Sequence, residues 1–392
     1  MFFNITKCSV PRTFHESHSF KKFTVHCDAG WHCTQQQNKW VLYKGYLNNG
    51  RLSDIVKTDA YNGHRGNYCI ITVDELENIA IHVSADRSFP LCYNSDTITN
   101  FDIQSLKNGK EAYADSCITA NSELVVNETV LDVIGNCNLD YSLTEDEVIS
   151  LIDTTLYNNI ASFVKYNTLP LKIFLSGGLD SMLLYSYIKR ITTDFELLNH
   201  EHFDYDTFWC NHGQTLISTN FFYSQLHHWK EPTVLVSGSN GDEYTMRNPE
   251  IVNLYMHYHG VDIMDRLTNY DNAYHLNHFT KKSYIKKLQE QEPKIAHIKQ
   301  LSKSEAIYYI CNMLINDYQH YHLGNTLTYT PFKDTQLAKY FMQLPLGSLI
   351  GQAVNGDVTR KLINNNDPAL LQYISTDKNS NERMANLSKL LG

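Results

Sequence analysis

Residues 176–181, Ser-Gly-Gly-Leu-Asp-Ser, have the composition and spacing of an anion-binding turn. They follow the apolar run Leu171 to Leu175 and precede Met182, so the pattern predicts a strand, a glycine turn and the start of a helix. The first amides of a helix have no carbonyl partner and lie at the positive end of its dipole. Two glycines let the backbone approach a pyrophosphate, and the hydroxyls of Ser176 and Ser181 can donate hydrogen bonds to it.

Asp180 in this turn adds a requirement for a cation. A carboxylate repels a phosphate unless a positive ion lies between them, so the turn implies Mg²⁺. An ordinary tight turn between a strand and a helix is the alternative interpretation. The sequence has no lysine-bearing GxxxxGK[ST] loop, which disfavours transfer of a γ-phosphate and favours cleavage between the α- and β-phosphates.

Residues 237–243, Ser-Gly-Ser-Asn-Gly-Asp-Glu, form a second glycine-rich stretch. It follows a predicted strand, Thr233 to Ser237, and Thr207 to Cys210 is another predicted strand. With the strand before residue 176, these segments indicate a doubly wound parallel sheet. Ligands gather at the carboxyl ends of such strands, so both loops are expected at one site, although an ordinary glycine-rich loop is the alternative for residues 237–243.

The elements that must position these loops are also visible in the sequence. Thr144 to Glu147 has the pattern of a capping box, and it is followed by apolar residues at helical spacing up to Phe163. From Phe23 to about Tyr93 short alternating apolar segments separated by turn signals predict a mostly β region. A polar connecting stretch then places the domain boundary near Ser142, with domains at 1–142 and 143–392.

These motifs together resemble the asparagine synthetase family, in the PP-loop ATP pyrophosphatase superfamily. SGGLDS is similar to the PP-loop, SGSNGDE is similar to the family's SGEGADE, and residues 330–345 are similar to its PFLDxxLxxFxxxLP segment. Residues 66–93 resemble the strand pair of the family's N-terminal glutaminase domain, which ends in DRxGxKPLYY. The resemblance covers about residues 23–93 and 144–365. It implies an α/β fold in which an N-terminal Ntn-hydrolase-like, β-rich (α+β) domain is followed by a doubly wound parallel-sheet PP-loop synthetase domain.

The activity that this resemblance implies is an AMP- and pyrophosphate-forming carbon–nitrogen ligase. Such an enzyme uses ATP and Mg²⁺ to adenylate a carboxylate, here aspartate or a related acid, and transfers the acyl group to ammonia or an amine. Asp180 and Asp242 are the implied metal ligands. The implied nucleotide-binding residues are Ser176, Gly177, Gly178, Leu179, Asp180, Ser181, Ser237, Gly238 and Glu243.

A basic pair near the C-terminus is the remaining part of the implied site. The family has GxTKxLLR, whose lysine neutralises charge on the adenylate, and the corresponding stretch here is Gly356 to Ile363. Alignment on Leu362 puts Arg360 in the lysine position and leaves Lys361 as the other candidate. Together with Asp242 these are the expected catalytic residues, and surface solvation is the alternative for both cations.

Two departures from the family pattern change the expected chemistry. Ser239 stands where the family has a glutamate thought to accept a proton from ammonia, and a neutral hydroxyl is no base near neutral pH. The family's glutaminase needs a cysteine directly after the initiator methionine, but here Phe2 occupies that position and Cys8 is internal. Of the family's NGE segment only the glycine of Lys44 to Tyr46 remains. The N-terminal domain is therefore expected to be a degenerate, glutamine amidotransferase-like fold, as in the β-lactam synthetases.

Two other function classes stay open at this stage. A catalytically degenerate nucleotide-binding or scaffolding module is consistent with Ser239 and with the lost glutaminase. A different PP-loop enzyme, acting on a nucleobase or a tRNA, would resemble this chain only at SGGLDS.

Composition excludes some partners and sets the expected surroundings. The chain has 392 residues, 42% of them hydrophobic, and a formal net charge of −9, which disfavours a general nucleic-acid or membrane-surface binder. The N-terminus lacks the features of a signal peptide, and nine irregularly spaced cysteines favour reduced thiols, so a cytoplasmic protein is expected. The expected partners are a small carboxylate and ammonia or an amine, and homodimerisation stays open.

The cysteine and histidine doublets at 26–27 and 32–33 could supply metal ligands. Their spacing does not match the CxxC pairs of zinc sites, so they are interpreted as structural residues, with a metal site as the alternative. The pairs His257 with His259 and His320 with His322 are interpreted in the same way.

Overall fold

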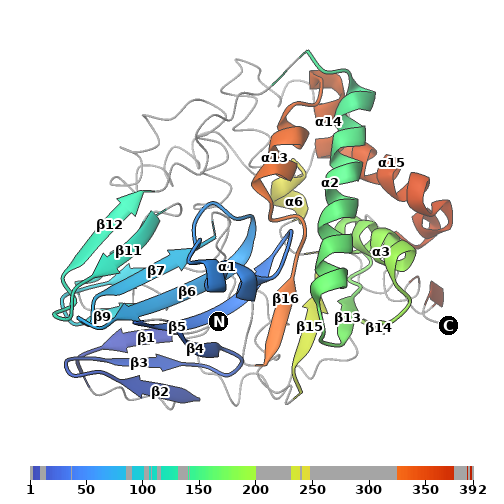
Figure 1. The fold of residues 1–392 in the computed structure, drawn as a ribbon. Coiled ribbons are helices and arrows are strands. Elements are labelled where there is room, and N and C mark those ends of the chain that lie inside the picture. The colour runs from blue at the N-terminus through green and yellow to red at the C-terminus, as the bar shows by residue number, and fades with distance from the viewer. Residues whose placement is uncertain are drawn as a thin grey trace.

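The computed structural model describes residues 3–8, 15–36, 38–84, 91–100, 106, 108–112, 116–130, 140, 142–199, 231–238, 241–247, 325–374, 386 and 389–390. Over these residues the protein is a mixed α/β structure with three sheets, two antiparallel and one parallel (Figure 1). The antiparallel sheets come from the N-terminal part of the chain, and the parallel sheet and most helices come from the remainder. Within the described ranges, every helix is too short or too polar to cross a bilayer.

The two antiparallel sheets confirm the predicted β-rich N-terminal region. The strands of the first are β1 (Phe3–Thr6), β2 (Glu16–Ser19), β3 (Thr24–Cys27), β8 (Cys92–Tyr93), β9 (Thr97–Thr99) and β10 (Lys110–Glu111). The strands of the second are β4 (His32–Gln36), β5 (Lys39–Leu47), β6 (Gly66–Asp74), β7 (Ile79–Val83), β11 (Ser116–Ala120) and β12 (Val126–Val130). Their orders are β10-β8-β9-β1-β3-β2 and β12-β11-β7-β6-β5-β4. A short helix that the sequence analysis missed, α1 (Leu52–Thr58), packs beside β5.

Both antiparallel sheets contribute to one hydrophobic core. Ile71, Ile81 and Ile118 lie in register across β6, β7 and β11 and are fully buried. They share this core with Ile5 and Val25 of the first sheet. The period-two alternation of apolar residues thus places one face of each sheet against the other.

Helix α2 (Glu145–Tyr166) begins as its sequence predicts. The Thr144 backbone amide donates to Glu147 Oε2 over 2.8 Å, and the Glu147 amide donates to Thr144 Oγ1 over 3.4 Å, which completes the capping box. The buried face of the helix includes Val148, Leu156 and Phe163, at the predicted spacing.

The parallel sheet has the order β14-β13-β15-β16. Its strands are β13 (Leu171–Phe174), β14 (Glu196–Leu198), β15 (Thr233–Val236) and β16 (Thr326–Tyr329). The predicted strands at β13 and β15 are confirmed, whereas β14 was not predicted and residues 207–210 lie outside the described residues. The chain adds β14 on one side of β13 and β15 on the other, which makes the β13/β15 boundary a topological switch point.

The helices of the second half pack into a core with the parallel sheet and α2. They are α3 (Leu179–Ile191), α6 (Gly241–Tyr244), α13 (Thr335–Met342), α14 (Leu346–Asn355), α15 (Asp357–Asn366) and the 3-10 helix Pro368–Tyr373. Among their contacts, α15 packs on α3 and on α14. This packing brings the C-terminal helices close to the start of α3 (Figure 1).

Two groups of residues join the N-terminal sheets to the second half. The ring of Phe163 stacks on that of Tyr329 with centroids 3.7 Å apart, and Tyr46 of β5 packs edge-on against both. The fully buried carboxylate of Asp334 accepts hydrogen bonds from Asn48 Nδ2 over 2.7 Å and from Asn159 Nδ2 over 2.9 Å. Asp334 also caps α13. One side chain of the segment 330–345 therefore links the loop after β5, helix α2 and helix α13.

Candidate active site

The predicted anion-binding turn lies between β13 and α3. Gly177 has a φ of +75°, and Gly178 is the N-cap of α3, so the glycines adopt the turn that the sequence predicts. The Ser181 hydroxyl accepts from the Ser176 amide over 3.2 Å and donates to the Gly178 carbonyl over 3.0 Å. Ser181 is buried, so its hydroxyl braces the turn from inside, while the first amides of α3 are left by helix geometry to face a ligand.

The loop after β15 packs directly onto this turn. A Cβ atom on Gly238 would lie 2.7 Å from the Ser181 amide nitrogen, and one on Gly241 would lie 2.2 Å from Asp180 Cγ. Neither distance is compatible with a side chain. Because β13 and β15 pair in parallel, their carboxyl ends meet at one sheet edge, and the two glycines allow the loops to touch there.

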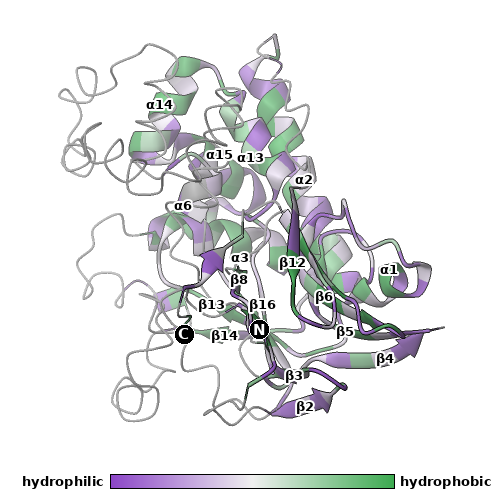
Figure 2. Ribbon diagram, turned by 90° about the vertical axis from the view of Figure 1, so that its left-hand side faces the viewer, coloured by the Kyte–Doolittle hydropathy of each residue, from purple (hydrophilic) through white to green (hydrophobic). Residues whose placement is uncertain are grey.

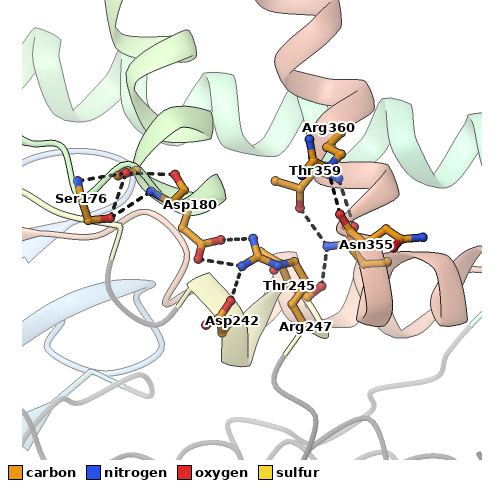
Figure 3. Close-up of polar contacts among 11 residues, drawn as sticks. Ser176, Asp180, Asp242, Thr245, Arg247, Asn355, Thr359 and Arg360 are labelled. Atoms are coloured by element: carbon orange, nitrogen blue, oxygen red, sulfur yellow. Dashed lines mark hydrogen bonds and ion pairs between the residues drawn. The ribbon is translucent and has the colours of Figure 1, made fainter. Parts of the chain in front are cut away.

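Asp180 and Asp242 share one cation in this structure, and that cation is Arg247. Arg247 Nη1 lies 2.8 Å from Asp180 Oδ1, and Nη2 lies 3.3 Å from Asp180 Oδ2. Nη2 also donates to Asp242 Oδ1 (Figure 3). Asp180 and Arg247 are largely buried, whereas Asp242 is half exposed. The sequence analysis missed Arg247, because nothing in the local sequence indicates that it turns back to residue 180.

The donor chemistry at this position fits Mg²⁺. Two carboxylates converge on one guanidinium, and carboxylate oxygens are the ligands that Mg²⁺ prefers. Asp180 and Asp242 would hold the ion, and Arg247 would have to turn away from them. When bound, Mg²⁺ would neutralise charge on the phosphates.

Arg360, which belongs to α15, lies beside Arg247. Its Nε donates to the Asn355 carbonyl over 3.0 Å, and burial, with the neighbouring Arg247, lowers the pKa of its guanidinium. Arg247 is paired with the carboxylates of Asp180 and Asp242, whereas Arg360 adds a second positive charge beside it. Figure 3 shows Arg360 and Asn355 grouped beyond Arg247, as seen from Asp180.

Gln352 on α14 holds this arrangement together. Its Nε2 donates to the Thr245 carbonyl over 2.9 Å and to Thr359 Oγ1 over 2.8 Å, and its Oε1 accepts from the Thr359 amide over 3.1 Å. Gln352 is fully buried, so it fixes the segment that carries Arg247 against the helix that carries Arg360.

Gly356, the first residue of the predicted GxTK-like segment, joins α14 to α15. It has a φ of +70°, and a Cβ atom there would lie 2.6 Å from Leu179 Cδ1. The side chain of Leu179 is buried against this glycine rather than directed to a ligand. Glycine is therefore required both for the left-handed turn and for the contact between α15 and the start of α3.

Lys361, the other predicted basic residue, is placed elsewhere. Its Nζ lies 2.9 Å from Asp146 Oδ1 in the first turn of α2, and both side chains are exposed. The structure thus brings Arg360, but not Lys361, next to Arg247.

The remaining predicted site residues have different positions. Ser237 is buried, and its amide donates to the Tyr329 carbonyl over 2.9 Å, so it continues the β15–β16 ladder. Glu243 belongs to α6, but its side chain lies outside the described part of the structure, as does Ser239. In the N-terminal half, Lys44 Nζ is buried and donates to the Ala29 carbonyl over 2.6 Å, and Cys8 is exposed.

Comparisons with known proteins add little to this geometry. No protein-family model and no curated protein matches the chain. A search of solved structures found the glutamine phosphoribosylpyrophosphate (PRPP) amidotransferase from B. subtilis complexed with ADP and GMP, at 10% sequence identity and a TM-score of 0.23. The match covers 62% of this chain and 71% of that chain. A likeness at this level carries no conclusion about activity or ligands.

Proposed function

We propose that this protein is an AMP- and pyrophosphate-forming ligase of the asparagine synthetase type. It would use ATP and Mg²⁺ to adenylate a small carboxylate and then transfer the acyl group to ammonia or an amine. The observation that carries the proposal is the contact between the turn after β13 and the loop after β15 at the switch point of a parallel sheet, where each contributes one carboxylate to a shared cation. The Ntn-hydrolase-like character of the N-terminal sheets and the PP-loop character of the second half belong to the same proposal.

Different residues of the site would bind the pyrophosphate, hold the metal ion and stabilise the α-phosphate in the first step, adenylation. A substrate carboxylate oxygen attacks the α-phosphorus of ATP, and pyrophosphate leaves. The helix amides after Gly178 would receive the pyrophosphate, and Asp180 with Asp242 would orient it through the metal ion. Arg360 and Arg247 would stabilise the negative charge that develops at the α-phosphate, since both are partly buried cations fixed beside the two loops.

The second step depends on how the nucleophile loses its proton. An amine attacks the acyl carbon, AMP leaves, and the proton of the attacking nitrogen must go to a base. Ser239 cannot accept it near neutral pH, so the acyl transfer would need another base to take that proton. The two steps must therefore be measured separately.

Release of AMP and pyrophosphate from ATP, in the presence of a pool of carboxylates, tests the first step. We expect the wild-type chain to form both products and Asp180→Asn to form neither, because the isosteric amide cannot hold the shared cation. Asp146→Asn is the matched control, since Asp146 is an exposed carboxylate whose ion-pair partner is Lys361 and not Arg247. Equal AMP formation by wild type and Asp180→Asn would refute the proposed ligase.

A second function is favoured by one observation. Ser239 stands where the asparagine synthetase family has a glutamate thought to act as base, a substitution that a nucleotide-binding module without catalysis would tolerate. Calorimetric titration with ATP and Mg²⁺ separates the two functions. Binding of ATP without any formation of AMP across the carboxylate pool would favour the module.

A further inference from the structure

Three side chains with metal-binding atoms converge at one end of the N-terminal sheets, far from the candidate active site in sequence. Glu16 on β2 pairs directly with Cys27 on β3 in an antiparallel register, and His18 lies two residues along β2 on the same face. Their ligand atoms all lie within 4.8 Å of one another. The three residue types supply a carboxylate oxygen, an imidazole nitrogen and a thiol sulfur.

The face on which they lie is the inner one. Along β3, Val25 and Cys27 are fully buried and belong to the hydrophobic core, whereas Thr24 and His26 are half-buried. Glu16 and His18 share the side of Val25 and Cys27 because of the strand register. The His18 and Glu16 side chains are 27% and 39% exposed, so the group lies at the margin of this core and stays open to solvent.

One ring nitrogen of His18 makes no hydrogen bond within the described part of the chain. Its Nε2 atom is inaccessible to solvent and has no hydrogen-bond partner among the described residues. The nearest carboxylate oxygen, Glu16 Oε2, is 3.6 Å away, beyond hydrogen-bond distance. The imidazole ring is held in place by Trp40, with ring centroids 4.8 Å apart. A lone pair on a fixed, buried imidazole nitrogen beside a thiol and a carboxylate is suited to a metal ion.

His26 and His32, the histidines of the two Cys/His doublets, contact residues outside this group. On the opposite face of the same strands, His26 Nδ1 lies 2.7 Å from Ser17 Oγ. The His32 ring stacks on Tyr43 with centroids 5.3 Å apart. The doublets in the sequence therefore do not form a ligand set, and the converging group contains only one of their four residues within 4.8 Å.

Cys33 of the second doublet lies next to the group on strand β4. It is near enough for its charge to act on Cys27 and for that of Glu16 to act on Cys33, but it is not one of the three residues whose ligand atoms lie within 4.8 Å of one another. Both thiols are free cysteines. β2 and β4 are the edge strands of the two sheets and lie at the same end of them (Figures 1 and 2). Figure 2 shows β2 as mostly hydrophilic, unlike the strands of the interior.

We propose that Glu16, His18 and Cys27 bind a divalent metal ion of the zinc class, with a fourth position left for solvent. Zn²⁺ accepts this mixture of nitrogen, sulfur and oxygen ligands in a tetrahedral arrangement. The ion would tie the edge strand β2 to β3, and it would be structural, since no part of the candidate active site contributes to it. Binding would displace the proton of the Cys27 thiol to solvent.

Cobalt titration of the full-length chain tests this site. The reduced protein, freed of metal with a chelator, is titrated with Co²⁺ and followed by visible absorption, and Zn²⁺ affinity is then measured by competition with a chromophoric chelator. We expect a single ion per chain and an absorption band from thiolate to Co²⁺. His18→Gln should weaken Zn²⁺ binding by about tenfold or more. His26→Gln is the matched control, because His26 lies on the opposite face of the same strand pair, and it should leave the affinity unchanged.

Three outcomes would overturn the proposal. One is the absence of a thiolate band in the wild-type protein, which needs no variant to fold. Another is an equal loss of affinity in His26→Gln and His18→Gln, which would indicate a general effect on the sheet. The third is a disulfide between Cys27 and Cys33 in freshly purified protein, detected by mass spectrometry. The inward-facing polar residues of β2 would then serve to prevent association of an edge strand.

Discussion

Arg247 Nη1 lies 2.8 Å from Asp180 Oδ1, so a guanidinium occupies the position that the sequence predicts for a divalent cation. The same group contacts Asp242, and it therefore holds the turn after β13 and the loop after β15 in one arrangement. If the site binds a nucleotide with Mg²⁺, the protein must exchange its own cation for the ion. Arg247 would then be free to face the phosphates beside Arg360.

Replacement of Arg247 should expose this exchange. In Arg247→Met the two carboxylates lose their shared cation, and we expect the free energy of unfolding to fall by about 2 kcal/mol without Mg²⁺. Added Mg²⁺ should stabilise this variant more than the wild type, since the ion no longer competes with the guanidinium. Denaturant unfolding with and without Mg²⁺ measures both effects. Arg51→Met, at an exposed arginine, is the control, and equal stabilisation by Mg²⁺ in all three proteins would argue against the exchange.

Arg360 and Lys361 should differ sharply in their effect on adenylation. Arg360 is half-buried next to Arg247, so Arg360→Met should lower the rate of AMP formation by about 10²- to 10³-fold. Lys361 makes only an exposed ion pair with Asp146, so Lys361→Met should change the rate little and the stability by less than about 1 kcal/mol. The measurement is the rate of pyrophosphate release at saturating ATP. A larger loss in Lys361→Met than in Arg360→Met would reverse the assignment.

Gly356 and Gly347 provide a matched pair of glycine substitutions. Gly356 joins α14 to α15, and Gly347 lies in the first turn of α14. Gly356→Ala forces a side chain into a left-handed turn and against Leu179, and it should cost about 1–3 kcal/mol and reduce AMP formation. Gly347 lies in α14 with nothing within 4 Å of an added Cβ, so Gly347→Ala should stabilise the protein by about 0.5–1 kcal/mol. Thermal and denaturant unfolding compare the two. Similar stability of both variants would contradict the close contact between α15 and α3.

His82 should make the stability of the N-terminal half depend on pH. It lines a hollow of about 600 Å³ on the second sheet, and burial lowers its pKa to about 4, although the nearby carboxylate of Asp59 acts in the opposite direction. As the pH falls, the unfolded chain, with a histidine pKa near 6.5, binds a proton before the folded chain does. The contribution of neutral His82 to the free energy of unfolding is therefore fully present above about pH 6.5 and is lost as the pH falls towards 4. Between about pH 7 and pH 5 this loss amounts to about 2 kcal/mol.

His82→Gln should remove that part of the pH dependence. The free energy of unfolding is measured against pH for the wild type, for His82→Gln and for His15→Gln, a substitution at an exposed histidine. His15→Gln should keep the slope of the wild type. An unchanged slope in His82→Gln would show that the imidazole is already solvated in the folded protein.

Local features of the sequence determined the elements that carry the candidate site. The strand, turn and helix around residues 171–182, the capping box of α2 and the strand before residue 237 follow from apolar periodicity and from the turn chemistry of glycine, and the structure confirms each of them. The adjacency of the two loops also followed, because parallel strands end at one edge. The strand β14 was missed, since three residues of strand carry too little pattern to predict.

Tertiary structure alone decided which side chains meet. The contact of Arg247 with Asp180 joins residues 67 positions apart, and it depends on how the loop after β15 packs on α3. The choice between Arg360 and Lys361 depends on one step of helical rotation, because successive residues of a helix point about 100° apart. In the N-terminal sheets, the register of β2 against β3 put Glu16 and His18, and not Ser17 and Ser19, on the face of Cys27, since a shift of one residue turns every side chain of a strand to the opposite face.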